Sequence, residues 1–301
     1  MNRTTVRIVV LGAGAGGGLP QWNCGCAQCA AARRGLIAPM TQSALAVSVD
    51  GDEWVLLNAS PDLRQQLADC AALHPRSLRG SPVRAVVLTN GDVDHIAGLL
   101  TLREKTGFML FATEATQGVL SANSVFNVLD PALVTRSVIA LDVPFEPLPG
   151  LTVTPYAVPG KVPLYLEDEG PPALAAMGEQ TIGLELRTAE REVHYVPGCA
   201  ALPDCLVRRL EPADAVFFDG TIWTDDEMPA SGTGAKTGAR MGHIAIGGAE
   251  GSLARLASLR GRRLYTHINN TNPALMPGSS ARAAIEAAGW EIARDRMEIL
   301  P

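Results

Sequence analysis

The stretch Thr89-Asn90-Gly91-Asp92-Val93-Asp94-His95 is the feature of this chain that most constrains its fold. The apolar run Val83 to Leu88 comes before it, and the apolar run Ile96 to Leu102 comes after it. Such a pattern predicts a buried strand, a polar loop and then a helix. The loop supplies carboxylates and an imidazole, which are metal-binding groups. Because Asp and Asn also favour turns and caps, a metal-free turn stays open as the alternative.

The pattern resembles the His-x-His-x-Asp-His motif of the metallo-β-lactamase superfamily. Asn90 and Asp92 stand where that motif has its two leading histidines, whereas Asp94-His95 is intact. In the superfamily the leading histidines serve one metal site, and the Asp-His pair joins a histidine near the C-terminus in a second. The resemblance therefore implies one surviving metal site, made of Asp94, His95 and His267.

This ligand set implies a particular chemistry. Two histidines and one carboxylate with open coordination positions are typical of non-haem Fe(II) oxygenases, so we expect a catalytic Fe2+, with other divalent metals able to enter the site. The hydrolases of the superfamily use a further histidine and a bridging aspartate. These would fall in Val158-Pro159-Gly160-Lys161 and in Val196-Pro197-Gly198-Cys199, where neither residue type occurs. Hydrolysis by a two-metal clamp is therefore not expected.

Three cysteines in Cys24-Gly25-Cys26-Ala27-Gln28-Cys29 form the second strong motif. Three thiols this close together cannot form the disulfide framework of a chain of this size. In a cytosolic protein such a cluster usually binds a metal. We expect Cys24, Cys26 and Cys29 to bind a structural Zn2+, which takes four ligands in a closed site. Incidental small core residues, or a redox pair with a spare thiol, remain alternatives. In the superfamily phosphodiesterases that share this loop, the fourth ligand lies three residues after the late histidine, which is Asn270 here, a poor zinc ligand.

The glycine-rich run Gly12 to Gly17 follows a predicted strand and matches the dinucleotide-binding pattern G-x-G-x-x-G. Pro20 interrupts the helix that this motif requires, and Arg33 and Arg34 stand where an acidic ribose ligand is expected. We therefore interpret these glycines as a tight backbone passage near a site.

Composition excludes several classes of function. The chain has 301 residues, is 47% apolar and carries a formal net charge of −6. No basic stripe suggests nucleic-acid binding, and no apolar run reaches the roughly 18 to 20 residues that span a bilayer. The glycine-rich N-terminus does not read as a signal peptide, so a cytoplasmic location is expected. With no linker or repeat, residues 1–301 are predicted to form one metallo-β-lactamase domain with the zinc loop at 24–29.

Strands and helices alternate along the chain, and two strand-rich halves with outer helices predict an α/β (α+β) fold, the αββα sandwich. Strands are expected at Phe108–Ala112, Glu192–Val196, Ala215–Asp219 and Arg263–His267, among others. Helices are expected from Ser60 to Ala72 with Ser60 as the cap, and at Ala97–Lys105, Asp204–Leu210, Ala249–Leu259 and Ser280–Ala288.

Further site residues are expected outside the two metal motifs. Asp219 ends a buried apolar strand, so its carboxylate should face a cleft, and His243 lies in a glycine-rich loop that could bring a base or a substrate contact to the site. Asp92 and Asp219 would orient water or take a proton near the metal. Cys199 is expected near the site, and Lys161, Lys236 and Arg240 are the cations expected near an acidic substrate.

Together, the motifs resemble a family of pyrroloquinoline quinone (PQQ) biosynthesis proteins over essentially the whole chain. The resemblance rests on the glycine-rich strand, the three cysteines, Asp-x-Asp-His, Phe217-Phe218-Asp219-Gly220-Thr221, Met241-Gly242-His243 and Thr266-His267-Ile268-Asn269-Asn270-Thr271-Asn272-Pro273, in this order. It implies Fe(II)- and O2-dependent hydroxylation of the tyrosine ring of a Glu-Tyr-derived precursor. A carrier or transport protein for PQQ or its precursor is the alternative, and metal-dependent hydrolysis is a weaker third. The implied partner is the small peptide-derived quinone precursor or PQQ, and the oligomeric state stays open, a homodimer being one option.

Overall fold

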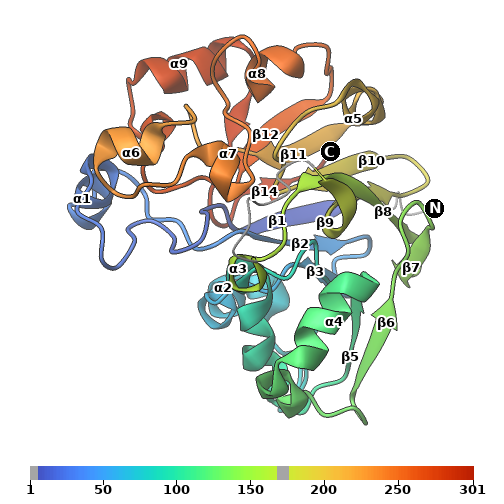
Figure 1. The fold of residues 1–301 in the computed structure, drawn as a ribbon. Helices are drawn as coiled ribbons and strands as arrows, with labels where there is room; N and C mark the ends of the chain where they lie inside the picture. Colours follow the sequence, from blue (N-terminus) through green and yellow to red (C-terminus); the bar gives the residue numbers. More distant parts are fainter. Residues whose placement is uncertain (1–5, 168–175) are drawn as a thin grey trace.

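Two mixed β-sheets pack face to face and helices cover their outer faces, as Figure 1 shows for this computed structural model. The structure describes residues 6–167 and 176–301. The first sheet has the strand order β14-β1-β2-β3-β4-β5-β6. Its strands are β1 (Arg7–Gly12), β2 (Ala44–Ser48), β3 (Trp54–Leu57), β4 (Val83–Val87), β5 (Phe108–Ala112), β6 (Val134–Val138) and β14 (Glu298–Ile299).

The second sheet mirrors the first, with the order β13-β12-β11-β10-β9-β8-β7. In each sheet one half is antiparallel and the other half is parallel, the parallel parts being β3 to β6 and β10 to β13. Because parallel strands end at one edge, the loops after β4, β11 and β12 are placed to build a site there. The strands are β7 (Phe145–Leu148), β8 (Leu151–Gly160), β9 (Ala176–Arg187), β10 (Glu192–Val196), β11 (Ala215–Asp219), β12 (Arg262–Thr266) and β13 (Glu291–Ile292).

The side chains of β1 show how the sequence creates two layers. Ile8 and Val10 join the larger core cluster, which includes Tyr195 and Phe217 of the second sheet. Val9 and Leu11 belong to the smaller cluster, in which the first sheet packs against its helices. Alternate residues of a strand face opposite sides of the sheet, so a fully apolar strand is buried on both faces.

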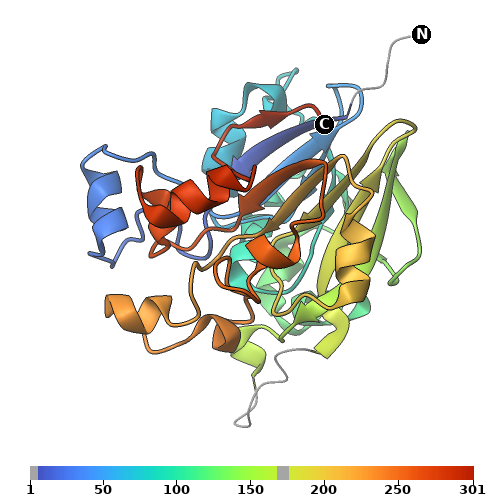
Figure 2. The ribbon, with the colours of Figure 1, turned by 90° about the horizontal axis from the view of Figure 1, so that it is seen from above.

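The helices are short and lie around this sandwich, as the view from above shows (Figure 2). Within the described part of the chain, none is long and apolar enough to cross a membrane. The α-helices are α1 (Ala27–Arg33), α2 (Leu63–Asp69), α3 (Val93–Ile96), α4 (Glu114–Ala122), α5 (Asp204–Leu210), α6 (Glu227–Ser231), α7 (Gly238–Met241), α8 (Ser252–Arg255) and α9 (Ser280–Ala287). Single 3-10 turns or short 3-10 helices cover Ala71–Leu73, Ala97–Arg103, Ser124–Val128, Leu164–Leu166 and Pro273–Leu275.

Two helix predictions were wrong in extent, and the helix expected at Ala97–Lys105 is a 3-10 helix over Ala97–Arg103. The helix expected from Ser60 begins only at Leu63, because the Ser60 hydroxyl donates to the Gln66 side chain and accepts from the Asp62 amide instead of capping the helix. The helix expected over Ala249–Leu259 is only α8, since its preceding backbone folds tightly: a β-carbon on Gly251 would lie 2.2 Å from the Gly247 carbonyl oxygen.

A buried histidine in β10 gives the fold a dependence on pH. His194 is fully buried; its Nδ1 accepts from the Tyr156 hydroxyl at 2.9 Å, and its Nε2 lies 3.1 Å from Glu192 Oε1. Burial lowers the pKa of His194, and the nearby Glu192 only partly offsets this effect. The neutral ring is therefore favoured in the folded state.

We expect His194→Gln to weaken the loss of stability on acidification. Unfolded histidine has a pKa of about 6.5, and the folded value is lower. The stabilising contribution of the neutral ring is thus complete above this pH and is lost as the pH falls toward the folded pKa. The variant should lose about 1 to 2 kcal/mol at pH 7.5 from its hydrogen bonds. Urea unfolding at pH 7.5 and pH 5 measures both effects, and an equal decline in the two proteins would contradict the assignment.

Candidate metal centre

The loop after β4 places two metal-binding side chains at the edge of the first sheet. The helix α3 begins at Val93, so Asp94 and His95 lie in its single turn and both reach the space between the sheets. The Asp94 Oδ2 atom lies 4.0 Å from His95 Nε2. Burial opposes ionisation of Asp94, but the histidines beside it hold the pKa of its carboxyl below the ordinary range.

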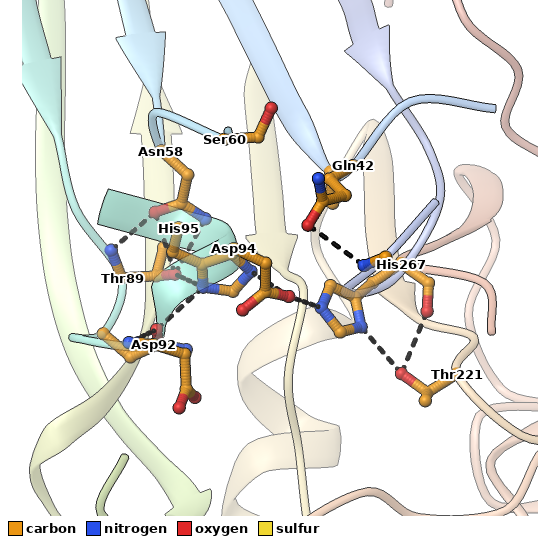
Figure 3. A network of polar contacts seen from close by, with 12 residues as sticks. Gln42, Asn58, Ser60, Thr89, Asp92, Asp94, His95, Thr221 and His267 are labelled. Atoms are coloured by element: carbon orange, nitrogen blue, oxygen red, sulfur yellow. Dashed lines mark hydrogen bonds and ion pairs between the residues drawn. The ribbon is translucent and has the colours of Figure 1, made fainter. Parts of the chain in front are cut away.

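His267 reaches the same point from the second sheet. It follows β12 directly, and its Nε2 lies 3.0 Å from Asp94 Oδ2. In Figure 3 the Asp94 carboxylate lies between the rings of His95 and His267. The three residues, 173 positions apart at most, thus form one compact group of ligand atoms, all within 4.8 Å of one another.

The hydrogen bonds of His95 leave one ring nitrogen free. Its Nδ1 is 2.8 Å from Asn90 Oδ1, which can only accept, so Nδ1 carries the proton. The other nitrogen, Nε2, is buried and has no hydrogen-bond partner among residues 6–167 and 176–301. Burial lowers the pKa of His95 to about 4, which keeps the ring neutral. A buried, neutral, unpartnered imidazole nitrogen is what a metal ligand offers.

Thr221 fixes the ring of His267 in the same way. The Thr221 hydroxyl lies 2.8 Å from His267 Nδ1 and donates to Asp219 Oδ1 at 2.6 Å, so it accepts the Nδ1 proton and leaves Nε2 to face Asp94. The backbone of His267 is left-handed, with φ 57°. This conformation is uncommon for a residue with a side chain and persists where the surroundings impose it.

The three side chains fit a metal ion. Nitrogen and oxygen ligands bind first-row metals at about 2.0 to 2.2 Å, so neighbouring ligand atoms are separated by about 3 Å when they share an ion. The 3.0 Å separation between His267 Nε2 and Asp94 Oδ2 matches this arrangement, whereas His95 Nε2, at 4.0 Å from the same oxygen, would have to move closer to share an ion. The glycine-rich run also borders it, since a β-carbon on Gly16 would lie 3.3 Å from Asp94 Oδ2. The interpretation of these glycines as a tight backbone passage is consistent with this closeness to the candidate site.

Asp219 does not face a cleft, and that prediction was wrong. Its side chain is fully buried and accepts hydrogen bonds from the Cys199 amide at 2.9 Å and from Thr221. Its Oδ2 also lies 2.7 Å from His243 Nδ1. The site-facing group is therefore His243, whose ring stacks on that of His267 with centroids 5.2 Å apart.

The loop after β10 has a glycine, not a carboxylate, at position 198, so it offers no ligand for a second metal ion there. Gly198 stands where the hydrolases of the superfamily are expected to have their bridging carboxylate. The nearest atom to a β-carbon built there is His243 Cε1, at 3.8 Å. Cys199 lies near the site as predicted, but its thiol donates to the Ala201 carbonyl and its amide, not its sulfur, holds Asp219.

The remaining predicted residues are Asp92, Lys161, Arg240 and Lys236, of which Lys236 is half-buried in the loop before α7. The Asp92 side chain is directed away from the Asp94 carboxylate (Figure 3). Burial, and then the negative charge of Asp94, raise the pKa of Asp92. Lys161 and Arg240 both pair with the buried Glu167 carboxylate, at 3.2 Å and 2.6 Å. These cations are therefore already neutralised in part by the protein itself.

The three cysteines converge next to the loop that carries His267. The Sγ atoms of Cys24, Cys26 and Cys29 lie within 4.8 Å of one another. The Asn270 Nδ2 atom lies 3.2, 3.6 and 3.3 Å from them, in that order. Rotation of this amide by half a turn would direct Oδ1 at the same point, because its oxygen and nitrogen are nearly equivalent in shape. The three thiols and Asn270 thus fit a tetrahedral zinc site.

We expect Cys26→Ser to lower zinc content and thermal stability together, because a serine hydroxyl replaces one of three thiolates. Zinc binding contributes on the order of 10 kcal/mol to folding of small zinc modules; here the ion holds a loop on a larger core, so a decrease of several degrees in Tm is expected. Metal analysis and a thermal melt test this, with Cys205→Ser, an exposed thiol, as control. Zinc-free wild-type protein with the Tm of the zinc-loaded protein would refute it.

Sequence reasoning did not identify two residues that hold the histidine ligands. Asn90 replaces a superfamily ligand and orients His95 instead, a role that the substitution alone did not reveal. Thr221 was noted only as part of a motif. Its partner His267 lies 46 positions away, so no local pattern links them.

Comparison with known proteins agrees with this architecture. The model of the beta-lactamase superfamily domain matches residues 53–268. Coenzyme PQQ synthesis protein B of Rhizobium meliloti is 58% identical over 99% of both chains. The crystal structure of Zn(2+)-bound PqqB from Methylobacterium extorquens superposes with a TM-score of 0.95 at 50% identity, covering 97% of this chain and 99% of that one. A diphosphatase of the PhnP family, at 22% identity and TM-score 0.68 over 98% of this chain and 96% of its own, shares the fold. The chain therefore belongs to the coenzyme PQQ synthesis protein B family of the beta-lactamase superfamily.

Proposed function

We propose that this protein is an Fe(II)-dependent oxygenase of PQQ synthesis that hydroxylates the tyrosine ring of a small Glu-Tyr-derived precursor. The observation that carries the proposal is the free, buried Nε2 of His95 beside Asp94 and the Nε2 of His267. Two histidines and a carboxylate form the ligand set of non-haem Fe(II) oxygenases. Bound there, Fe(II) would supply activation of O2 for ring hydroxylation.

The residues that hydrogen-bond to the two histidines suit a single ion with a fixed geometry. Asn90 and Thr221 each accept the Nδ1 proton of one histidine ligand, which directs both Nε2 atoms inward. Such partners tune and orient metal ligands. Asn90 occupies a position where the hydrolases have a ligand, so its amide favours one metal site over two.

His243 is the residue that we propose accepts the phenolic proton. Asp219 holds its Nδ1 at 2.7 Å, which leaves Nε2 as the basic atom, and its ring lies against that of His267. A histidine oriented by a buried carboxylate is a common general base. Asp92 lies two residues before Asp94 and is proposed to orient water or the substrate.

The decisive experiment loads the zinc-containing protein with Fe(II) under anaerobic conditions and then adds O2, ascorbate and a Glu-Tyr dipeptide. One oxygen atom should enter the ring and the other should leave as water, with ascorbate supplying two electrons. Mass spectrometry with 18O2 should show the labelled product. Binding of the dipeptide without O2 consumption would refute the oxygenase and support a carrier of the precursor or of PQQ.

The same preparation should show negligible hydrolysis of a β-lactam and of a phosphodiester. Asn90 and Asp92 replace imidazole ligands, and Gly198 replaces the bridging carboxylate, so the second metal of a hydrolytic pair lacks ligands. Turnover at ordinary enzyme rates, about 1 to 1000 per second, on either substrate would contradict the proposed reaction class.

A further inference from the structure

The loop His267–Asn272 joins the two candidate metal sites. Its first residue faces Asp94, and its fourth residue, Asn270, faces the three cysteine sulfurs. All its polar residues are buried: His267, Asn269, Asn270, Thr271 and Asn272 are each less than 9% exposed. Buried polar groups need hydrogen-bond partners, so the contacts of this loop decide its conformation.

The cysteine loop supplies one set of these contacts. Besides the Asn270 amide, the Cys26 thiol donates to the Asn270 carbonyl at 3.5 Å, and Gln28 Nε2 donates to the Thr271 carbonyl at 2.9 Å. The preceding glycine run adds backbone hydrogen bonds between Ala13, Ala15 and Ile268, each 2.8 Å long. The N-terminal segment therefore makes hydrogen bonds to Ile268 near the start of the loop and to Asn270 and Thr271 near its end.

The segment after β11 supplies the other set. Thr271 Oγ1 donates to the buried Glu227 carboxylate at 2.6 Å, and Asn272 Nδ2 donates to the Gly220 carbonyl at 3.0 Å. The Asn269 amide donates to the carbonyl of Thr221, the residue that orients the His267 ring. A shift of the loop would therefore move His267 and its orienting partner together.

We infer that the Cys24, Cys26, Cys29 and Asn270 cluster is a positioning element for His267, so that the two metal sites bind their ions cooperatively. The left-handed backbone of His267 needs support from its surroundings. A thiophilic ion at the cysteines fixes the side chain of Asn270, only three residues away, and thereby supports that conformation. This inference rests on the proposed ligand set of Asp94, His95 and His267.

Mn(II) binding tests this coupling without any reference to turnover. Mn(II) suits carboxylate and other oxygen ligands, whereas thiolates select softer ions, so Mn(II) reports on the site that contains Asp94 and not on the cysteines; free Mn(II) is counted by electron paramagnetic resonance. Removing zinc should weaken Mn(II) binding by about tenfold or more, the scale on which residues behind metal ligands act. Zinc added at no more than one equivalent, which the thiolates bind first because they are the softer ligands, should restore it. Linkage requires the reciprocal effect, tighter zinc binding in the presence of Mn(II).

Gln28→Ala separates a mechanical effect from the charge of the zinc ion. It removes the hydrogen bond to Thr271 but no thiol, so the zinc-loaded variant should also bind Mn(II) more weakly and exchange the Ile268 amide faster. Gln65→Ala, which removes an exposed glutamine bonded to Asp69, is the matched control and should leave both readouts unchanged.

Two results would overturn the inference: folded, zinc-free protein with the Mn(II) affinity of the zinc-loaded protein, or zinc-loaded Gln28→Ala with wild-type affinity. If removal of zinc unfolds the chain, the Gln28→Ala comparison decides alone. The His267→Ala variant distinguishes a failure of the proposed metal centre from a failure of the coupling between the two sites. Unchanged Mn(II) binding in that variant would refute the proposed metal centre itself, whereas lost binding there with no zinc dependence would refute only the coupling.

Discussion

His267→Ala is expected to abolish oxygen insertion and Fe(II) binding while leaving the zinc content unchanged. His267 is one of three proposed ligands of the catalytic ion, and its Nε2 lies 3.0 Å from Asp94 Oδ2. The variant would keep Asp94 and His95, two ligands that do not complete the facial set. The proposed zinc site consists of Cys24, Cys26, Cys29 and Asn270, all of which the variant keeps, so an ion bound there should stay. Iron and zinc analysis with 18O incorporation measures all three effects.

His74→Ala is the matched control for this variant. The His74 ring contacts the Ala68 carbonyl at 2.8 Å, in the exposed region before β4, so both metals and the activity should survive its removal. Full oxygen incorporation by His267→Ala would refute the proposed centre. Dipeptide binding retained in this variant, with no O2 consumed even by the wild type, would favour the carrier function.

The elements that the sequence predicted best are those with short-range signals. The strands Phe108–Ala112, Glu192–Val196 and Ala215–Asp219 and the helix Asp204–Leu210 have the predicted bounds, because apolar runs end at turn residues or a helix starts after a proline. Within the predicted helix Ala249–Leu259 only Ser252–Arg255 is helical, because the backbone at Gly248 adopts φ 89° and turns away. The spacing of apolar residues along the sequence does not reveal such a turn.

The metal centre was predictable only through motif order. Asp94-His95 is a local motif, but its pairing with His267 depends on a contact between sheets across 173 positions. Asn90, Thr221 and Asp219 make hydrogen bonds that cannot be inferred from the spacing of residues in the sequence. For Asp219, the end of a buried strand suggested a cleft; the carboxylate is instead fully buried and contacts His243 at 2.7 Å.

The Asp219 carboxylate should be required for both folding and turnover, and two substitutions separate these roles. Asp219→Ala removes the acceptor of the Cys199 amide, the Thr221 amide and hydroxyl, and His243. Because buried donors without an acceptor are costly, the free energy of unfolding should fall by about 3 to 5 kcal/mol. Urea unfolding measures this loss, with Asp204→Ala, an exposed carboxylate paired with Arg255, as control.

Asp219→Asn keeps one oxygen acceptor and the shape of the side chain, so its loss of stability should be smaller than that of Asp219→Ala. His243 would lose its carboxylate partner, however, and with it the orientation and basicity of Nε2. Turnover should therefore fall by about 10²- to 10⁴-fold, the usual contribution of a general base, while Fe(II) binding changes little, since Asp94, His95 and His267 are intact. If Asp219→Asn hydroxylates the dipeptide at the wild-type rate, His243 is not the base, and the buried carboxylate serves only to join Cys199, Thr221 and His243 in one folded unit.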